Sequence, residues 1–285
     1  MNVNNITVVG AGAMGSQIAL SFALHGFKVI LNDITDEKLN LVEENLKKLM
    51  RRRVEKGRIS EAECQEAFNN LKFSSSLEQS VKDTDLVVEA VIEDLKIKRE
   101  LFVQLDELAP AHAVLASNSS TIVSSKIAEA TNRPDKICNM HFFNPAVIMD
   151  LVEIVKGPHT ADETIETITE VTRQINKTPV VLEKEIFGFI VSRIVNVIFD
   201  EAMYLYEEGI ASIEDIDTAV EKGLNHPIGP FKLLDLTGID VNYYLRKERV
   251  DETGDETYAP QKSLTQLFEE GHLGRKTGKG FYDYN

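Results

Sequence analysis

The chain has 285 residues, 43% hydrophobic and 27% charged, as expected of a globular protein with one large or two ordinary domains. A net charge of −15 argues against nucleic-acid binding, and no apolar run approaches membrane length, so no membrane partner is expected. The two cysteines, Cys64 and Cys138, lack metal-ligand spacing, which predicts reduced thiols and no metal site. The N-terminal residues show neither a basic stretch nor an apolar signal region, so we expect a cytoplasmic protein.

The first segment with a clear signature predicts a β-turn-α-β unit. An apolar β-branched run at 6–9 is followed by a helical pattern at 14–25 and by a second apolar run at 28–31. The turn between the first strand and the helix reads GAGAMG and has the G-x-G-x-x-G spacing of dinucleotide-binding folds. A glycine-rich structural turn is the plainer alternative.

Each residue of this turn has a physical role in binding a dinucleotide. Gly10 permits the tight turn, and Gly12 lets the backbone approach a pyrophosphate. Gly15 lets the helix pack closely against the strand. Ala13 and Met14 lie between them, where the free N–H groups of the helix N-terminus would point at the phosphates.

Asp33 follows the second strand and decides between the two readings of the turn. At this place a carboxylate accepts hydrogen bonds from both ribose hydroxyls of an adenosine. The structural reading has to treat the placed acid as chance. Because Asp33 would repel a 2′-phosphate and no arginine follows it closely, we expect NAD rather than NADP as the cofactor.

A basic cluster stands out in the next segment. The patterns at about 36–56 and 60–70 predict two helices that form a hairpin inserted into the sheet domain. Near the end of the first helix, seven cations accompany the single acid Glu55: Lys47, Lys48, Arg51, Arg52, Arg53, Lys56 and Arg58. A solvated helix face is a common alternative, because cations are favourable near a helix C-terminus. In so acidic a chain, the cluster favours a polyanionic ligand.

Three further apolar runs, at 85–90, 113–117 and 136–140, predict more parallel strands. Polar loops follow the last two of these runs, Ser117–Thr121 (SNSST) and His141–Pro145 (HFFNP). In open α/β sheets, ligands bind at the carboxyl edge of the strands. The two loops are therefore candidates for one functional site.

The alternation in the segment 149–155 places Glu153 on the same face as Leu151 and Val155, which predicts a buried carboxylate. Such a group needs a partner. His141, at the end of the preceding strand, is the natural one, because a carboxylate on one ring nitrogen fixes the tautomer and raises the basicity of the other. A structural ion pair or a satisfied core histidine is the alternative reading.

The pattern changes after a last strand predicted at 179–182 and a charged junction at 183–185. We therefore expect a Rossmann domain at 1–185 and a helical domain at 186–285. The strongly apolar helices of the second domain favour burial against a partner subunit. The predicted fold class is α/β, a Rossmann-type, doubly wound and mostly parallel sheet with an inserted helical hairpin, followed by an all-α C-terminal domain.

Motifs along the whole chain carry a family resemblance: GAGAMG, VVEAVIEDLKIKRELF, ASNSST, HFFNPAVIMDLVEIV, GFIVSRI, EDIDTAVEKGLNHPIGPFKLLD and GRKTGKGFYDY. The chain resembles the L-3-hydroxyacyl-coenzyme A dehydrogenases, and most closely the short bacterial 3-hydroxybutyryl-coenzyme A dehydrogenases. The resemblance implies a reversible, NAD-linked oxidation of a 3-hydroxyacyl thioester to the 3-ketoacyl thioester. It also implies a homodimer formed through the helical domain.

The same resemblance assigns the catalytic residues one by one. His141 matches the catalytic histidine and Glu153 the acid paired with it. Ser120 matches the serine that contacts the 3-oxygen of the substrate, and Asn144 the asparagine of the HFFNP loop. A positioned base fits the chemistry, because a secondary alcohol must lose a proton as the hydride leaves C3.

Binding residues follow from the resemblance as well. Glu93 and Lys98 match positions near the nicotinamide end of the cofactor, and Asn118 is grouped with them as cofactor-binding. Lys56 falls where the family has a basic residue that meets the phosphates of coenzyme A. Arg52, one helical turn earlier, is predicted to bind the acyl-CoA together with Lys56.

The chain departs from the family pattern in places, and Ser192 is the largest departure, because the family carries a substrate-contacting asparagine there. Two alternatives therefore stay open. One is a related hydroxyacid dehydrogenase of the gulonate type, against which the basic helix argues. The other is a catalytically impaired NAD- or acyl-CoA-binding homologue, against which the pair of His141 and Glu153 argues.

Overall fold

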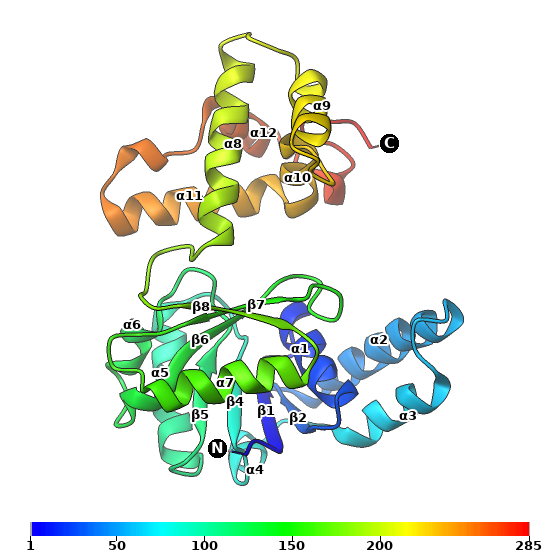
Figure 1. Ribbon diagram of the computed structural model, residues 1–285, viewed down its shortest axis with the longest axis vertical. Helices are drawn as coiled ribbons and strands as arrows, with labels where there is room; N and C mark the ends of the chain where they lie inside the picture. Colours follow the sequence, from blue (N-terminus) through cyan, green and yellow to red (C-terminus); the bar gives the residue numbers. More distant parts are fainter. Residues whose placement is uncertain (1, 285) are drawn as a thin grey trace. The chain divides into compact units, whose positions relative to one another are not determined.

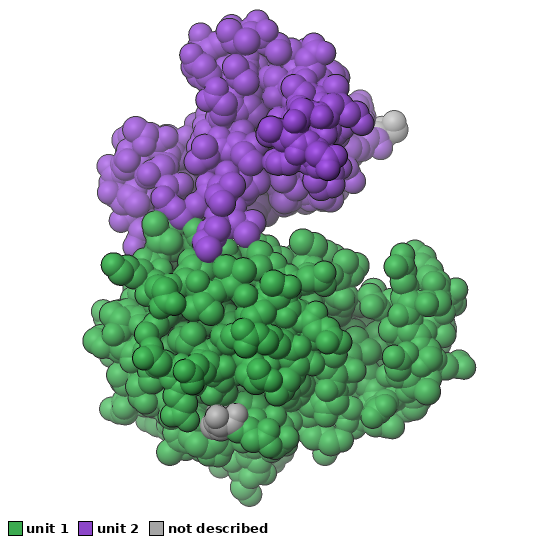
Figure 2. All heavy atoms as spheres, viewed as in Figure 1, with its two compact units in different colours: residues 1–189 green, residues 190–285 purple. Residues whose placement is uncertain are grey.

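The computed structural model describes residues 2–284 as two compact units, one ending at Phe189 and the other beginning at Ile190. Figure 2 colours the two units separately. The charged segment 183–185, expected to be the junction, lies inside the first unit. There Glu185 Oε1 accepts hydrogen bonds from Ser124 Oγ and Ser125 N, each 2.7 Å long. Within 2–284, no helix is both long and apolar enough to cross a bilayer.

The first unit is built on one eight-stranded sheet in the order β3-β2-β1-β4-β5-β6-β7-β8. The first six strands in this order run parallel, β7 runs antiparallel to β6, and β8 runs parallel to β7. The strands are β1 (Asn5–Val9), β2 (Lys28–Asn32), β3 (Leu71–Ser74), β4 (Leu86–Glu89), β5 (Val114–Ser117), β6 (Ile137–Phe142), β7 (Leu151–Val155) and β8 (Thr178–Leu182). The chain leaves β1 toward β2 on one side and returns to β4 on the other, so the topological switch point lies between β1 and β4.

Helices cover both faces of this sheet, as the predicted doubly wound fold requires. They are α1 (Ala13–Leu24), α2 (Asp36–Glu55), α3 (Glu61–Asn70), α4 (Leu77–Val81), α5 (Leu95–Leu108), α6 (Ser124–Ala128), the 3-10 turn η1 (Pro134–Lys136) and α7 (Asp162–Gln174). Neighbouring residues of one strand serve opposite faces. Val88 packs in the core under α1, α2, α3 and α7, whereas Val87 packs in the core under α4, α5 and α6.

The inserted hairpin is the antiparallel pair of α2 and α3, which projects from the side of the first unit in Figure 1. The Thr35 side chain caps α2, and Ser60 forms a capping box with Glu63 at the start of α3. Gly57, with φ +63°, provides the left-handed residue that lets the chain reverse between them. The hairpin is therefore fixed by local signals that the sequence contains.

The second unit is all-α, as predicted, and is shown with its labels in Figure 1. Its elements are α8 (Val191–Glu207), α9 (Ile213–Gly223), α10 (Pro230–Thr237), α11 (Ile239–Thr253), η2 (Glu256–Tyr258), α12 (Lys262–Glu269) and η3 (Arg275–Thr277). Phe199, Met203, Phe231, Leu234 and Leu264 lie in its core. These side chains come from α8, α10 and α12, so this core joins helices distant in sequence.

Two buried aspartates connect elements of this helical unit through backbone hydrogen bonds. Asp217 Oδ1 accepts the Phe231 N–H at the start of α10, at 2.8 Å. Asp235 accepts the backbone N–H groups of Phe281 and Tyr282, each at 2.9 Å. Burial raises the pKa of the Asp235 carboxyl. The GFYDY motif therefore has a structural function in anchoring the C-terminal segment.

Candidate active site

The glycine-rich turn after β1 lies at the switch point of the sheet. Gly10 has φ +104°, and a Cβ added there would lie 2.5 Å from the Ala90 carbonyl oxygen. A Cβ on Gly15 would lie 1.8 Å from the Gly10 carbonyl oxygen. A Cβ on Gly12 would have no atom within 4 Å. Gly10 and Gly15 are thus required by close packing inside the protein, while Gly12 borders open space.

The N-terminus of α1 is open to a ligand. Gly12 is the N-cap, and no side chain caps the helix. Ala13 and Met14 begin the helix, and its first turn contains no acidic residue. The free N–H groups of such a helix end favour an anion, and the absent side chain of Gly12 lets a ligand approach the backbone. The turn therefore fits the pyrophosphate of a dinucleotide.

Asp33 directly follows β2, and its side chain is almost fully buried. Its Oδ2 atom accepts the Ala11 N–H at 2.6 Å, and its Oδ1 atom accepts the Ile34 N–H at 2.8 Å. The ammonium of Lys38 also lies 2.6 Å from Oδ2. Burial raises the pKa of Asp33, but the hydrogen bonds from Lys38, Ala11 and Ile34 outweigh this effect and hold the pKa below its ordinary value. No role for this lysine was predicted from the sequence, where only an arginine after Asp33 was considered.

His141 and Glu153 lie opposite each other in the antiparallel pairing of β6 with β7. The His141 Nδ1 atom is 2.9 Å from Glu153 Oε2, and the Glu153 side chain is 0% exposed. Because a carboxylate accepts hydrogen bonds, it selects the tautomer with a proton on Nδ1 and leaves Nε2 as the basic nitrogen. The rings of Phe143 and Phe189 lie 4.6 and 5.6 Å from the imidazole, centroid to centroid, and restrict its rotation.

Three further predicted residues, Asn118, Ser120 and Asn144, lie in the loops after β5 and β6, which are neighbouring parallel strands. Asn118 Oδ1 accepts the Phe142 N–H at 2.9 Å and so ties the two loops together next to His141. Ser120 is half-buried in the first loop, and Asn144 is exposed in the second. The structure therefore brings the SNSST and HFFNP segments to the same edge of the sheet.

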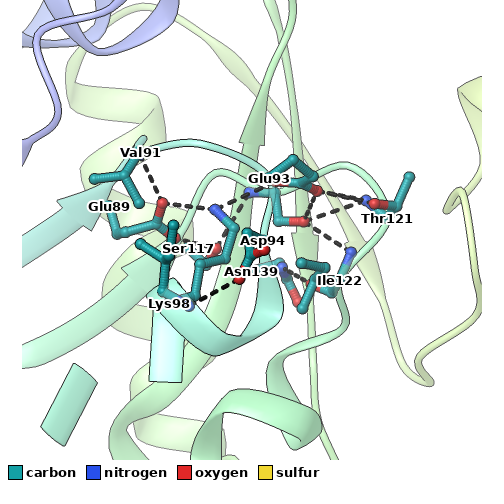
Figure 3. A network of polar contacts seen from close by, with 11 residues as sticks. Glu89, Val91, Glu93, Asp94, Lys98, Ser117, Thr121, Ile122 and Asn139 are labelled. Carbon is teal, nitrogen blue, oxygen red and sulfur yellow. Dashed lines mark hydrogen bonds and ion pairs between the residues drawn. The ribbon is translucent and has the colours of Figure 1, made fainter. Parts of the chain in front are cut away.

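A network of charged side chains, shown in Figure 3, lies beneath this edge. Lys98 Nζ in α5 is 2.6 Å from Glu89 Oε1 at the end of β4 and 3.2 Å from Glu93 Oε2. The Lys98 and Glu89 side chains are 1% and 0% exposed. Ser117 Oγ, at the end of β5, donates to Glu89 Oε2 at 2.7 Å. The ends of two strands and the first turn of α5 are thus held by one buried ion pair.

Glu93 extends this network to the loop that carries Ser120. Its Oε1 atom accepts hydrogen bonds from the hydroxyls of Ser119 and Thr121, the latter at 2.9 Å. Burial raises the pKa of Glu93, but the charge of Lys98 and these hydrogen bonds outweigh this effect and hold the pKa below its ordinary value. Because Ser119 and Thr121 flank Ser120, the carboxylate fixes that turn from both sides. Neither Glu89 nor this contact of Glu93 was predicted from the sequence, where an acid inside the strand run DLVVEA is the one signal for Glu89.

The remaining predicted residues are exposed or belong to the second unit. Arg52 lies in the last turn of α2, Lys56 is its C-cap, and both side chains are exposed. Ser192 is half-buried in the first turn of α8, and Asn196 lies one turn later on the same face, almost fully buried. The roles of Arg52, Lys56 and Ser192 stay predictions.

Fold and site together define a class of protein. A doubly wound sheet with an open helix N-terminus at its switch point, an acid after β2 and a buried histidine–carboxylate pair is a dinucleotide-dependent oxidoreductase. Residues 5–186 match the NAD-binding domain of the 3-hydroxyacyl-CoA dehydrogenases, and residues 188–284 match the C-terminal domain of the same enzymes. The chain therefore belongs to the family of NAD-dependent 3-hydroxyacyl-CoA dehydrogenases, and the resemblance stated from its motifs is confirmed.

Individual relatives cover the whole chain. The chain is 41% identical to a 3-hydroxybutyryl-CoA dehydrogenase of Clostridioides difficile, over 98% of this chain and 99% of the relative. It is 39% identical to the mitochondrial hydroxyacyl-coenzyme A dehydrogenase of Homo sapiens, over 99% and 91%. The crystal structure of an (S)-3-hydroxybutyryl-CoA dehydrogenase from Ralstonia eutropha matches with a TM-score of 0.94 and 35% identity, over 100% of both chains.

Proposed function

We propose that this protein catalyses the reversible NAD-dependent oxidation of 3-hydroxybutyryl-CoA to acetoacetyl-CoA. The observation that carries the proposal is the buried His141–Glu153 pair, 2.9 Å apart, at the ligand-binding edge of a family NAD-binding domain. The names of similar bacterial proteins favour the four-carbon substrate over a gulonate-type acid. A spectrophotometric assay of acetoacetyl-CoA with NADH tests it. Failure to oxidise NADH with acetoacetyl-CoA or longer 3-ketoacyl-CoA would reject it.

His141 is the general base in the proposed direction of oxidation. Its Nε2 atom removes the proton of the 3-hydroxyl group as the C3–H bond breaks, and in reduction it returns that proton. Glu153, hydrogen-bonded to Nδ1, orients the ring and stabilises the imidazolium that forms. When bound, NAD supplies the nicotinamide that accepts the hydride.

Other residues of this chain position the reactants. Ser120 donates a hydrogen bond to the 3-oxygen, and Asn144 contributes a polar group from the facing loop. Glu93 holds the turn of Ser120 near the nicotinamide, and Lys98 acts through Glu93 because its own ammonium is buried between two carboxylates. The cofactor would be held by Gly10, Gly12, Ala13, Met14, Gly15, Asp33 and Asn118.

The exposed cations at the end of α2 are proposed to bind the phosphates of coenzyme A. Replacing Arg52 and Lys56 together by alanine should raise KM for acetoacetyl-CoA and weaken its salt dependence, with little change in kcat. Contacts far from C3 are similar in the ground and transition states, and salt screens them. The matched control is Lys72→Ala with Lys82→Ala, which removes the same charge from exposed positions elsewhere in the unit. An unchanged KM in the α2 variant would restore the reading of a solvated helix face.

Ser192 is proposed to alter a substrate contact without silencing the enzyme. Serine offers one hydroxyl on a shorter arm than the amide of asparagine, so a hydrogen bond is lost or relayed through water. Such a bond contributes about 0.5–1.5 kcal/mol, so Ser192→Asn should change kcat/KM by roughly two- to tenfold. Asn196→Ala should affect turnover only if Asn196, one turn later on the same helix, supplies the substrate contact that Ser192 lacks. A wild type inactive on all chain lengths, with robust activity in Ser192→Asn, would instead support the impaired-homologue alternative.

A homodimer through the helical unit is part of the same proposal. Several apolar side chains of α8 are exposed in the single chain, among them Ile194, Val197 and Tyr204. Clustered apolar side chains of this kind favour burial against a second subunit. The cytoplasmic location also stays a prediction.

A further inference from the structure

Lys38 occupies a position that helix energetics disfavour. It is the third residue of α2, where the positive end of the helix dipole favours acids such as the preceding Asp36 and Glu37. Its ammonium instead reaches back to Asp33 Oδ2 at 2.6 Å. The Lys38 side chain is 49% exposed, whereas that of Asp33 is 5% exposed. A half-exposed cation therefore lies at the predicted binding group for the adenosine ribose.

The hydrogen bonds of Asp33 show what this cation does to the ribose site. Holding both ribose hydroxyls requires a free acceptor position on each carboxylate oxygen. Oδ2 already accepts the Ala11 N–H and the Lys38 ammonium, while Oδ1 accepts only the Ile34 N–H. Because an oxygen of a carboxylate has about two acceptor positions, Lys38 competes with one ribose hydroxyl of NADH.

The same cation changes the energetics of a 2′-phosphate. Asp33 alone would repel that group, but the Lys38 charge offsets the repulsion and its flexible stem can turn the ammonium toward an anion. A purely structural role, neutralising the buried Asp33, makes a different prediction. It would change the binding of NADH and NADPH in the same direction.

We propose that Lys38 is a residue that determines cofactor selectivity. By occupying Asp33 Oδ2 it limits the affinity for NADH, and by its charge it lets NADPH bind, so the preference for NADH is narrower than Asp33 alone would impose. This inference rests on the proposed function only in using the same cofactor site.

The test measures binding of each cofactor by fluorescence titration without acyl-CoA. Lys38→Met should raise the ratio of the NADPH Kd to the NADH Kd by roughly tenfold, equivalent to about 1.4 kcal/mol. Lys38→Arg retains the charge and should keep NADPH binding. The matched control is Lys82→Met, which removes an exposed lysine elsewhere in the same unit and should leave the ratio unchanged.

The inference is overturned if the ratio of the NADPH Kd to the NADH Kd in Lys38→Met stays within about twofold of the wild-type ratio. A change of the same size and direction for both cofactors also overturns it. Lys38→Gln, which retains a polar side chain, gives the same readout if the methionine variant folds poorly. The outcome is independent of the proposed function, because a protein inactive on acetoacetyl-CoA still reports both Kd values.

Discussion

His141→Ala is expected to lower kcat for acetoacetyl-CoA reduction by on the order of a hundredfold or more, while the Kd for NADH stays unchanged. The variant loses the imidazole of His141. Among residues 2–284, this is the only histidine that forms an ion pair with a fully buried carboxylate. Proton transfer to the 3-oxygen must then come from water, which is not held in position. Stopped-flow or steady-state measurement of NADH oxidation, together with a fluorescence titration of NADH, checks both parts.

The chain contains a matched control for this substitution. His112 Nε2 lies 3.0 Å from Asp85 Oδ1, so it too forms a histidine–carboxylate pair, but its side chain is 54% exposed. Asp85 directly precedes β4 and therefore lies at the opposite end of that strand from the glycine turn and its neighbouring loops. His112→Ala should leave kcat unchanged. If His141→Ala keeps most of its activity, the general base lies elsewhere and the assignment of Glu153 as its partner fails with it.

The pair of His141 and Glu153 was predictable from the sequence because a carboxylate buried by strand alternation needs a polar partner. The alternation in 149–155 predicts that Glu153 is buried, and a strand that follows the HFFNP loop can bring Glu153 beside His141. The pairing in the structure follows this logic. The glycine turn and most strands were likewise predicted from local patterns. The antiparallel direction of β7 was not, because alternation alone does not distinguish parallel from antiparallel pairing.

Contacts that join distant segments were not predicted from the sequence. Lys98 was predicted only through the family resemblance, and its burial against Glu89 was not predicted, because in the pattern LKIKRELF it has the periodicity of a lysine on an amphipathic helix. Strand β3 was missed because Leu71–Ser74 is a four-residue run with only Leu71 buried. The contact of Lys38 was not predicted because its partner, Asp33, precedes the helix that contains Lys38. In each case a tertiary contact decides the role of a residue with an ordinary local pattern.

The largest expected effect on stability comes from Lys98→Met. Removing one partner of a buried ion pair leaves an uncompensated charge, which typically costs about 3–5 kcal/mol. Glu89 is fully buried and would keep only the N–H of Val91 and the hydroxyl of Ser117 as donors. We expect the free energy of unfolding of the first unit to fall by that amount, measured by urea denaturation. Lys96→Met, an exposed lysine on the same helix, is the matched control and should change it by less than about 0.5 kcal/mol.

A second substitution separates the effect of charge from that of packing. In the double variant Glu89→Gln with Lys98→Met, no charge of this pair remains, and the amide oxygen of glutamine can still accept a hydrogen bond from Ser117 or Val91. Replacing both partners of a buried pair is often nearly neutral, so the double variant should recover about half or more of the loss. A double variant no more stable than Lys98→Met would show that the loss comes from the packing of the lysine stem. A single variant that loses less than about 1 kcal/mol would show that this ion pair contributes no more stability than a surface ion pair does. Either result would mean that the charge of Lys98 is not what stabilises the network of Figure 3.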